Sequence, residues 1–271
     1  MSVLSAFLFG LLQGVTEFLP VSSSGHLAVL KELTNLEEVP LLFDILLHLA
    51  SLGAVLLVFR KKIGLLITST WRFIIRKAGP QDRENLVYVM AIVVGTFVTG
   101  VMGLLIKKFF PDPSIKLVSV LFIVTAIVLC LGFIIGRYHE KRTASLASRS
   151  VRVRDGLVCG FAQGLGVFPG ISRSGITISS ALSVGVPRAV AGELSFLLSI
   201  PAILGAFILE LKDADTLMAQ VEFWPLLVGV LAAFVSGLLA LKLLMTLVRK
   251  GTLAWFAIWL LPLGIIGLLY L

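Results

Sequence analysis

The stretch QGVTEFLPVSSSGHL, residues 13–27, introduces a carboxylate, a proline, three consecutive serines and a histidine where an apolar helix would otherwise continue. Lipid cannot satisfy the hydrogen bonds of such a run, so in a membrane it must be buried in protein or line a water-filled cavity. The apolar segments on either side, residues 3–19 and 24–30, are short for a bilayer, which takes about 20 residues to cross. The stretch therefore predicts a re-entrant helical hairpin with a polar tip.

A second stretch, QGLGVFPGISRSGIT at residues 163–177, repeats the first at a constant offset of 150 residues. The pairs that are identical at this offset are Gly10/Gly160, Gln13/Gln163, Gly14/Gly164, Phe18/Phe168, Ser22/Ser172, Ser24/Ser174 and Gly25/Gly175. The match predicts an internal repeat within a single membrane domain, with repeat 1 at about residues 1–137 and repeat 2 at about residues 152–271.

The composition is that of a polytopic helical membrane protein. Of the 271 residues, 58% are hydrophobic and 14% are charged, and the mean hydropathy is +1.05, whereas a soluble domain of this length would carry more charge. The net charge of +8 comes from basic residues clustered between apolar segments, which favours the cytoplasmic face of a membrane over nucleic acid as the partner. Cys130 and Cys159 lie in apolar stretches and are expected to be free thiols, and no cleaved signal peptide is expected.

Six segments are long and apolar enough to cross the membrane, and two broken segments are not. The predicted spans are residues 41–59, 86–106, 117–137, 188–210, 223–247 and 253–271, and the predicted re-entrant hairpins cover residues 3–30 and 156–185. Between the first two spans, residues 63–75 are expected to form an amphipathic helix on the membrane surface, with Trp71 at the interface. The fold expected is an all-α polytopic membrane protein with six transmembrane helices plus two re-entrant hairpins.

The distribution of Lys and Arg sets the expected orientation. Loops 60–85, 137–155 and 248–252 are basic and are expected in the cytoplasm, which leaves loops 31–40, 107–116 and 211–222 outside. Counted from these loops, the first hairpin enters from outside and the second from the cytoplasm. The two repeats therefore have inverted topology, with opposed hairpins whose tips meet near the bilayer midplane, where membrane proteins of this design build ligand sites.

The two tips carry groups that suit a multiply charged anion, with phosphate or diphosphate as the natural candidate. Each tip precedes the N-terminus of a short helix, where free backbone N–H groups and the positive end of the helix dipole favour anions. Arg173 adds a cation, either as an anion clamp or as a structural partner of Glu17. The residues expected to contact the substrate are Gln13, Ser22, Ser24, Gly25, Ser172, Ser174 and Gly175.

Glu17, Ser23 and His26 are the candidates for catalysis at the first tip. Glu17 would bind a divalent cation, act as general base or orient His26. Ser23, at the middle of the tip, is the expected nucleophile with His26 as its partner; a His26 nucleophile, direct attack by water, and a packed His26 without a catalytic role are the alternatives. Asp44 and His48, four residues apart on one span, are expected to hydrogen-bond locally, with a supporting role behind the site as the alternative.

At these residues the chain resembles the undecaprenyl-diphosphate phosphatase family, the bacterial membrane proteins associated with bacitracin resistance. The first family motif is similar to the run from Gln13 through Glu17 to His26, and the second is similar to PGISRSGIT at residues 169–177. Size, basic loops and repeat layout are also similar, so the resemblance covers essentially the whole chain. It implies a site lined by Glu17, Ser23, His26, Ser172, Arg173, Ser174 and Thr177.

The resemblance implies hydrolysis of undecaprenyl diphosphate to undecaprenyl phosphate and inorganic phosphate, which recycles the carrier lipid of cell-wall synthesis. It also implies a divalent cation, Mg²⁺ or Ca²⁺, with Glu17 as a ligand, although Gln13 stands where many relatives have Glu. The expected location is the bacterial cytoplasmic membrane, with the site open to the outer side, and assembly as a homodimer is left open. The alternative function is an inverted-repeat transporter or flippase of a phosphorylated lipid or anion.

Overall fold

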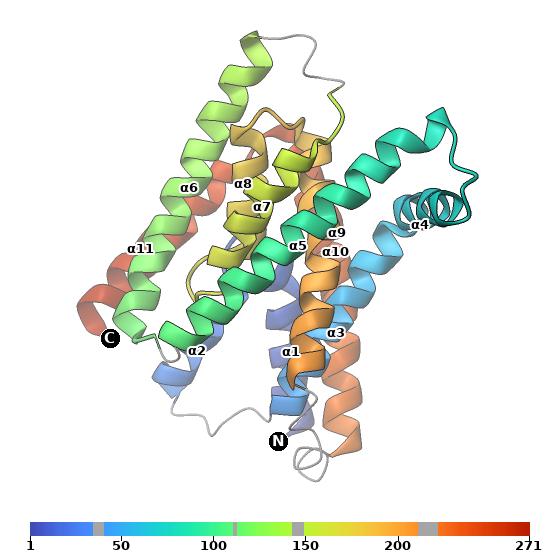
Figure 1. The fold of residues 1–271 in the computed structure, drawn as a ribbon. Helices are drawn as coiled ribbons and strands as arrows, with labels where there is room; N and C mark the ends of the chain where they lie inside the picture. The colour runs from blue at the N-terminus through green and yellow to red at the C-terminus, as the bar shows by residue number, and fades with distance from the viewer. Residues whose placement is uncertain (35–40, 111–112, 143–148, 211–221) are drawn as a thin grey trace.

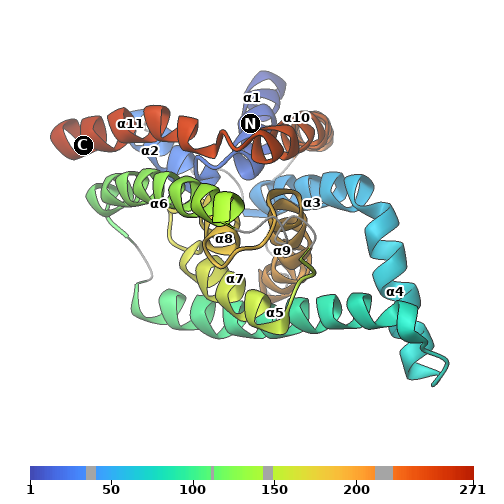
Figure 2. The same ribbon diagram turned by 90° about the horizontal axis from the view of Figure 1, so that it is seen from above.

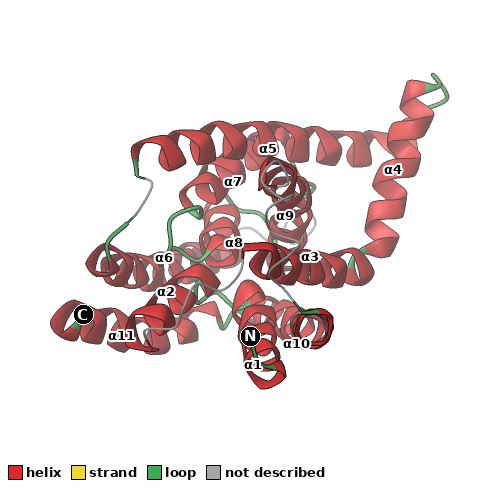
Figure 3. Ribbon diagram, turned by 90° about the horizontal axis from the view of Figure 1, so that it is seen from below, coloured by secondary structure: helices red, strands yellow, loops and turns green. Residues whose placement is uncertain are grey.

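The computed structural model describes residues 1–34, 41–110, 113–142, 149–210 and 222–271, and these residues form helices without a strand (Figure 3). The helices are α1 (Val3–Phe18), α2 (Ser23–Thr34), α3 (Leu41–Val58), α4 (Arg60–Ile74), α5 (Arg83–Phe109), α6 (Ile115–Arg142), α7 (Val153–Leu165), α8 (Arg173–Ser183), α9 (Arg188–Glu210), α10 (Phe223–Lys250) and α11 (Ala257–Tyr270), with 3-10 turns at Pro80–Asp82 and Leu253–Phe256. The prediction of an all-α protein is confirmed. Parts of the predicted loops, residues 35–40, 111–112, 143–148 and 211–221, lie outside the described residues.

Five helical segments of the described chain are long and apolar enough to cross a membrane. They are Pro80–Phe109, Ile115–Lys141, Arg188–Leu209, Phe223–Lys250 and Leu253–Tyr270. A sixth span results if α3 is counted together with α4, which follows it after a bend of 78°. Each of these segments overlaps a predicted span almost completely, so hydropathy located the long helices correctly.

The bend between α3 and α4 separates a packed helix from one that projects from the bundle. α3 packs against α10 and α9, whereas α4 leaves the corner of the bundle and crosses to α5 (Figure 2). Ile67, Trp71 and Ile74 of α4 are 64%, 60% and 64% exposed. A helix is therefore present where an amphipathic surface helix was predicted, and it carries an unburied apolar face.

α1 with α2, and α7 with α8, form two hairpins that open in opposite directions (Figure 1). In that view the first hairpin opens toward the bottom and the second toward the top, and their tips meet in the middle of the bundle. Pro20 and Pro169 follow the ends of α1 and α7, where a residue without an N–H cannot continue a helix. Gly170 turns the second tip with a φ of +94°, a conformation that favours glycine.

Each hairpin packs closely along one long helix through a glycine contact. α1 lies along α10, and α7 lies along α5. A Cβ atom at Gly10 would collide with the backbone of Gly229 on α10, and one at Gly160 would collide with the backbone of Gly95 on α5. Because Gly10 and Gly160 are equivalent in the internal repeat, both copies use the same small-residue contact to bring backbones together.

Candidate active site

The two hairpin tips are hydrogen-bonded to each other. The Ser22 hydroxyl accepts the backbone N–H of Gly170 from the other hairpin at 3.0 Å and that of Gly25 from its own at 3.3 Å. The Ser174 hydroxyl donates in the opposite direction, to the Phe18 carbonyl at 2.9 Å. Ser22 has a φ of +67°, a left-handed conformation that is costly for a residue with a side chain and that these bonds hold in place.

Ser22 and Ser172 begin α2 and α8 in the same way. The Ser172 hydroxyl accepts the N–H of Gly175 at 3.1 Å, just as Ser22 does for Gly25. Such an N-cap satisfies one of the free N–H groups of a helix's first turn. The caps leave the positive ends of both helix dipoles at the junction of the two tips, a setting that favours an anion.

A cavity of about 720 Å³ opens beside this junction. The residues that line it from the tips are Glu17, Ser22, Ser23, Ser24, Ser172 and Arg173, all of which the sequence predicted at the site. Polar residues from other helices include Asp44 and His48 of α3 and Thr96, Thr99 and Lys107 of α5, and α9 adds an apolar wall that extends to Leu209. The cavity therefore combines a polar end at the tips with an apolar flank.

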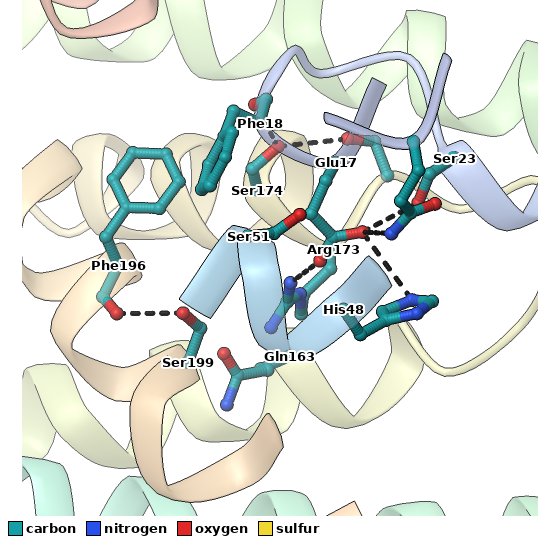
Figure 4. A network of polar contacts seen from close by, with 12 residues as sticks. Glu17, Phe18, Ser23, His48, Ser51, Gln163, Arg173, Ser174, Phe196 and Ser199 are labelled. Carbon is teal, nitrogen blue, oxygen red and sulfur yellow. Dashed lines mark hydrogen bonds and ion pairs between the residues drawn. The ribbon is translucent and has the colours of Figure 1, made fainter. Parts of the chain in front are cut away.

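Glu17 lies at the centre of a polar network (Figure 4). Its side chain is 5% exposed, its Oε1 pairs with Arg173, and its Oε2 accepts hydrogen bonds from Ser23 Oγ at 2.9 Å and Gln13 Nε2 at 3.0 Å. His48 Nε2 lies 3.8 Å from the same Oε2 atom. A buried carboxylate requires such compensation, and here it has one cation and two neutral donors.

Arg173 and Ser23 reach the Glu17 carboxylate from different hairpins. Ser23 begins α2 and Arg173 begins α8, and the two positions are equivalent at the 150-residue offset. The structural pair of Arg173 with Glu17, one of the two roles considered for the arginine, is present. The Arg173 side chain is also 24% exposed and lines the cavity, so the same guanidinium is available to an anion that enters it.

His26 is turned away from the cavity. The indole N–H of Trp259 donates to its Nε2 at 2.9 Å, and because that nitrogen accepts, the proton of a neutral ring lies on Nδ1, which contacts the Ser22 carbonyl at 2.8 Å. The ring also stacks on Trp259 and meets Phe122 edge-on. His26 therefore fastens the first tip to α11, and the catalytic role predicted for it has no contact with the cavity to support it.

Five other residues predicted at the substrate lie behind the cavity wall. They are Gln13, Gly25, Ser174, Gly175 and Thr177. The Thr177 hydroxyl donates to the Arg173 carbonyl at 2.7 Å and also contacts the Ser195 hydroxyl. A Cβ atom at Gly25 would lie 2.7 Å from the Phe122 ring, so a larger residue there would push the tip away from α6. These residues shape the tips, and the side chains that line the cavity are their neighbours.

His48 and Lys107 line the cavity although the sequence did not place them in the site. His48 Nδ1 lies 3.0 Å from the Asp44 carbonyl, the local bond that was expected. Since a carbonyl can only accept, Nδ1 carries a proton and Nε2 is the nitrogen that faces Glu17. An Asp and a His on an apolar span are costly in lipid, and that cost was the sequence signal that could have identified them.

The described residues do not fit a divalent cation held by protein ligands alone. They contain no group of three or more His, Cys, Asp or Glu side chains suited to a metal. Both oxygens of Glu17 are already engaged by Arg173, Ser23 and Gln13. The buried Oε1 of Gln13 has no hydrogen-bond partner within the described chain, but one neutral oxygen does not make a Mg²⁺ or Ca²⁺ site. No chemical step is therefore derived through a metal.

Known proteins are similar to this chain along nearly its whole length. The family model described as bacitracin resistance protein BacA matches residues 6–266. An undecaprenyl-diphosphatase of Treponema denticola is 48% identical over 265 residues, which cover 98% of this chain and 96% of the relative. Undecaprenyl-diphosphatases of Carboxydothermus hydrogenoformans and Borreliella burgdorferi are 39% and 38% identical, over 98% of this chain in each case and over 96% and 97% of the relative. The chain therefore belongs to the bacitracin resistance protein BacA family.

Proposed function

We propose that this protein hydrolyses the phosphoanhydride of undecaprenyl diphosphate in the cavity between the two tips, giving undecaprenyl phosphate and inorganic phosphate. One observation carries the assignment: Ser23 and Arg173, from equivalent positions of the two hairpins, contact the two oxygens of one buried carboxylate, Glu17, beside a cavity. A hydroxyl on a carboxylate base, with an arginine and two helix N-termini at hand, suits phosphoryl transfer. The transporter alternative is not favoured, because the relatives above are named as diphosphatases.

Binding of the diphosphate is assigned to the cations and dipoles of the tips. Arg173 exchanges part of its contact with Glu17 for phosphate oxygens, and the first turns of α2 and α8 offer backbone N–H groups. Lys107 lines the cavity near the end of α5 and attracts the anion toward it. The arginine and the helix dipoles then stabilise the charge that develops as the anhydride breaks.

Ser23 is proposed as the nucleophile and Glu17 as its base. The Ser23 oxygen attacks the terminal phosphorus while its proton moves along the existing 2.9 Å hydrogen bond to Glu17 Oε2. The bond from the terminal phosphorus to the bridging oxygen breaks, and that oxygen leaves with undecaprenyl phosphate. Water then attacks the phosphoserine, the Ser23 oxygen leaves with the proton held by Glu17, and inorganic phosphate is released.

His48 takes the supporting role that the sequence analysis gave to His26. Its Nε2 lies 3.8 Å from Glu17 Oε2 and its ring is held by the Asp44 carbonyl. In this position it orients the carboxylate and helps to hold the proton that Glu17 receives. His26 is proposed to position the first tip through its contact with the Ser22 carbonyl.

The proposed membrane layout has six spans and two re-entrant hairpins, with the cavity open to the outer side of the bacterial cytoplasmic membrane. Two observations support this layout. The hairpins are opposed, and the cavity extends from the tips to Lys107 of α5 and Leu209 of α9, the helix ends that adjoin the loops predicted outside. The cation requirement and the homodimer stay predictions, which a chelator titration of activity and a molar-mass measurement in detergent would test.

Release of inorganic phosphate from undecaprenyl diphosphate by the purified protein tests the proposed function. We expect turnover by the wild-type protein and loss of turnover in the Glu17→Gln variant, with lipid binding retained. Intact binding of the lipid without phosphate release, with Mg²⁺, with Ca²⁺ or with chelator, would contradict a hydrolase and favour a carrier.

A further inference from the structure

A second recess lies under α4, beside the cavity that holds the proposed reaction. It has a volume of about 430 Å³ and is walled by α4, α5 and α9, with Leu66, Ile67, Ile92 and Ile200 among its lining residues. Thr70 is the one lining residue with a hydroxyl, and that hydroxyl donates to the Leu66 carbonyl of its own helix at 2.8 Å. The recess therefore offers an apolar surface without a free side-chain hydroxyl, which suits a hydrocarbon chain and not a polar ligand.

The recess owes its shape to two breaks in the helices. The 78° bend after α3 carries α4 across to α5 and away from the bundle wall (Figure 2). Pro201 lies inside α9, where it cannot donate a backbone hydrogen bond. Pro201 lines both the recess and the cavity, so the two spaces adjoin at this residue.

One face of α5 runs along both spaces. Val89 and Val93 line the recess, and the same stripe continues through Thr96, Gly100, Gly103 and Lys107 in the cavity. Spacings of three and four residues keep these positions on one side of the helix, over a length of about 27 Å. That length is close to the roughly 30 Å of the hydrocarbon core. The stripe is apolar at one end, small and polar in the middle, and cationic at the other end, which is the polarity of a lipid with an anionic head group.

We propose that the recess under α4 binds the isoprenoid chain of the substrate while its diphosphate occupies the cavity at the tips. This inference rests on the proposed function and adds the path of the tail. The lipid keeps the direction that it has in the outer leaflet, with its head group toward the outer side and its chain toward the cytoplasmic half. α4 thus acts as a chain-binding helix, and its exposed residues Ile67, Trp71 and Ile74 form part of the tail site.

The test compares a long and a short substrate in variants that fill the recess. Ile67→Trp and Val93→Trp add bulk from α4 and α5, while Leu65→Trp and Met90→Trp add the same bulk at exposed residues of the same helices outside the recess. The measured quantity is kcat/KM for undecaprenyl diphosphate divided by kcat/KM for geranyl diphosphate, whose chain has two isoprene units. Hydrolysis of geranyl diphosphate by each variant also shows that the variant is folded.

We expect the ratio to fall about tenfold or more in Ile67→Trp and Val93→Trp, which corresponds to about 1.4 kcal/mol of lost tail binding, and to stay at the wild-type value in Leu65→Trp and Met90→Trp. An unchanged ratio in the two recess variants would overturn the tail assignment. So would a fall confined to Ala206→Trp, because Ala206 lines the outer part of the cavity and a tail leaving there would avoid α4. Absence of hydrolysis of both substrates by the wild-type protein would overturn the proposed function, and the tail path with it.

Discussion

Ser23 begins α2 and Arg173 begins α8, and the two residues are equivalent in the internal repeat. The tips around them are built alike, because Ser22 and Ser172 cap their helices through the same serine-to-glycine hydrogen bond. They differ in the group that each delivers to Glu17, a hydroxyl from the first tip and a guanidinium from the second. The duplicated scaffold thus supplies a nucleophile and a cation to one carboxylate.

The second tip has no carboxylate of its own to serve. Val167 stands at the position equivalent to Glu17, and Ile176 at the position equivalent to His26. Its other hydroxyls are used within the protein, since Ser174 donates to the Phe18 carbonyl. The comparison teaches that divergence of a few positions after duplication made two tips interdependent, so that neither contains a complete site.

The largest effect is expected from removing the cation of the second tip. Arg173→Ala should lower kcat for phosphate release by about 10³-fold or more, the range found when an arginine that stabilises phosphoryl transfer is lost. Arg173→Lys should recover part of the rate, because it restores charge without the forked geometry. Arg152→Ala, at an exposed arginine near the same hairpin, is the control. Wild-type turnover by Arg173→Ala would rule out the clamp.

The hydroxyl of the first tip comes next in expected size. Ser23→Ala should lower kcat by about 10²- to 10⁴-fold, because it removes the group that donates to Glu17. Ser24→Ala, at the neighbouring serine that also lines the cavity, should have a much smaller effect. Rapid-quench analysis of the wild-type protein should detect a phosphoserine, and a larger loss in Ser24→Ala than in Ser23→Ala would reassign the nucleophile.

The two histidines near the first tip should differ in the opposite order from the one that the sequence suggested. His48→Gln should lower kcat by about 10²-fold, since it removes the imidazole that faces Glu17. His26→Gln should cost less in kcat and more in thermal stability, because it loosens the contact of the tip with Trp259. Steady-state kinetics and melting curves in detergent measure both. A greater loss of kcat in His26→Gln would restore His26 to the chemistry.

The smallest effect concerns the caps themselves. Ser22→Ala and Ser172→Ala each remove an N-cap, worth about 1 kcal/mol of stability. Ser22→Ala should be the more destabilising, because the Ser22 hydroxyl also accepts the N–H of Gly170 from the other hairpin. Thermal unfolding of the two variants compares them, and equal melting temperatures would show that the bond between the hairpins adds nothing.

Much of this arrangement was predictable from the sequence because its signals are local. The 150-residue offset predicted two like hairpins, and hydropathy located the long helices. The cost of charge in lipid marked Glu17 and Arg173, and the structure brings them together. Ser23 followed from its place at the middle of a polar tip, and it donates to Glu17.

The remainder depends on contacts that no local pattern contains. The orientation of His26 is set by Trp259, 233 residues further along the chain. His48 faces Glu17 because α3 packs beside α1, which the spacing of Asp44 and His48 did not reveal. Ser174 and Thr177 share the motif of Arg173, yet a helix turns successive residues to different faces, so their hydroxyls point into the protein.

Phosphate release from undecaprenyl diphosphate by a double-mutant cycle of Ser23→Ala and Arg173→Ala tests most directly whether the two tips form one catalytic unit. Groups that act as a unit are strongly non-additive, so the double variant should be no slower than the slower single variant by more than a few-fold. Rate losses that multiply, with the double variant slower by the product of the two single effects, would contradict a shared site at Glu17.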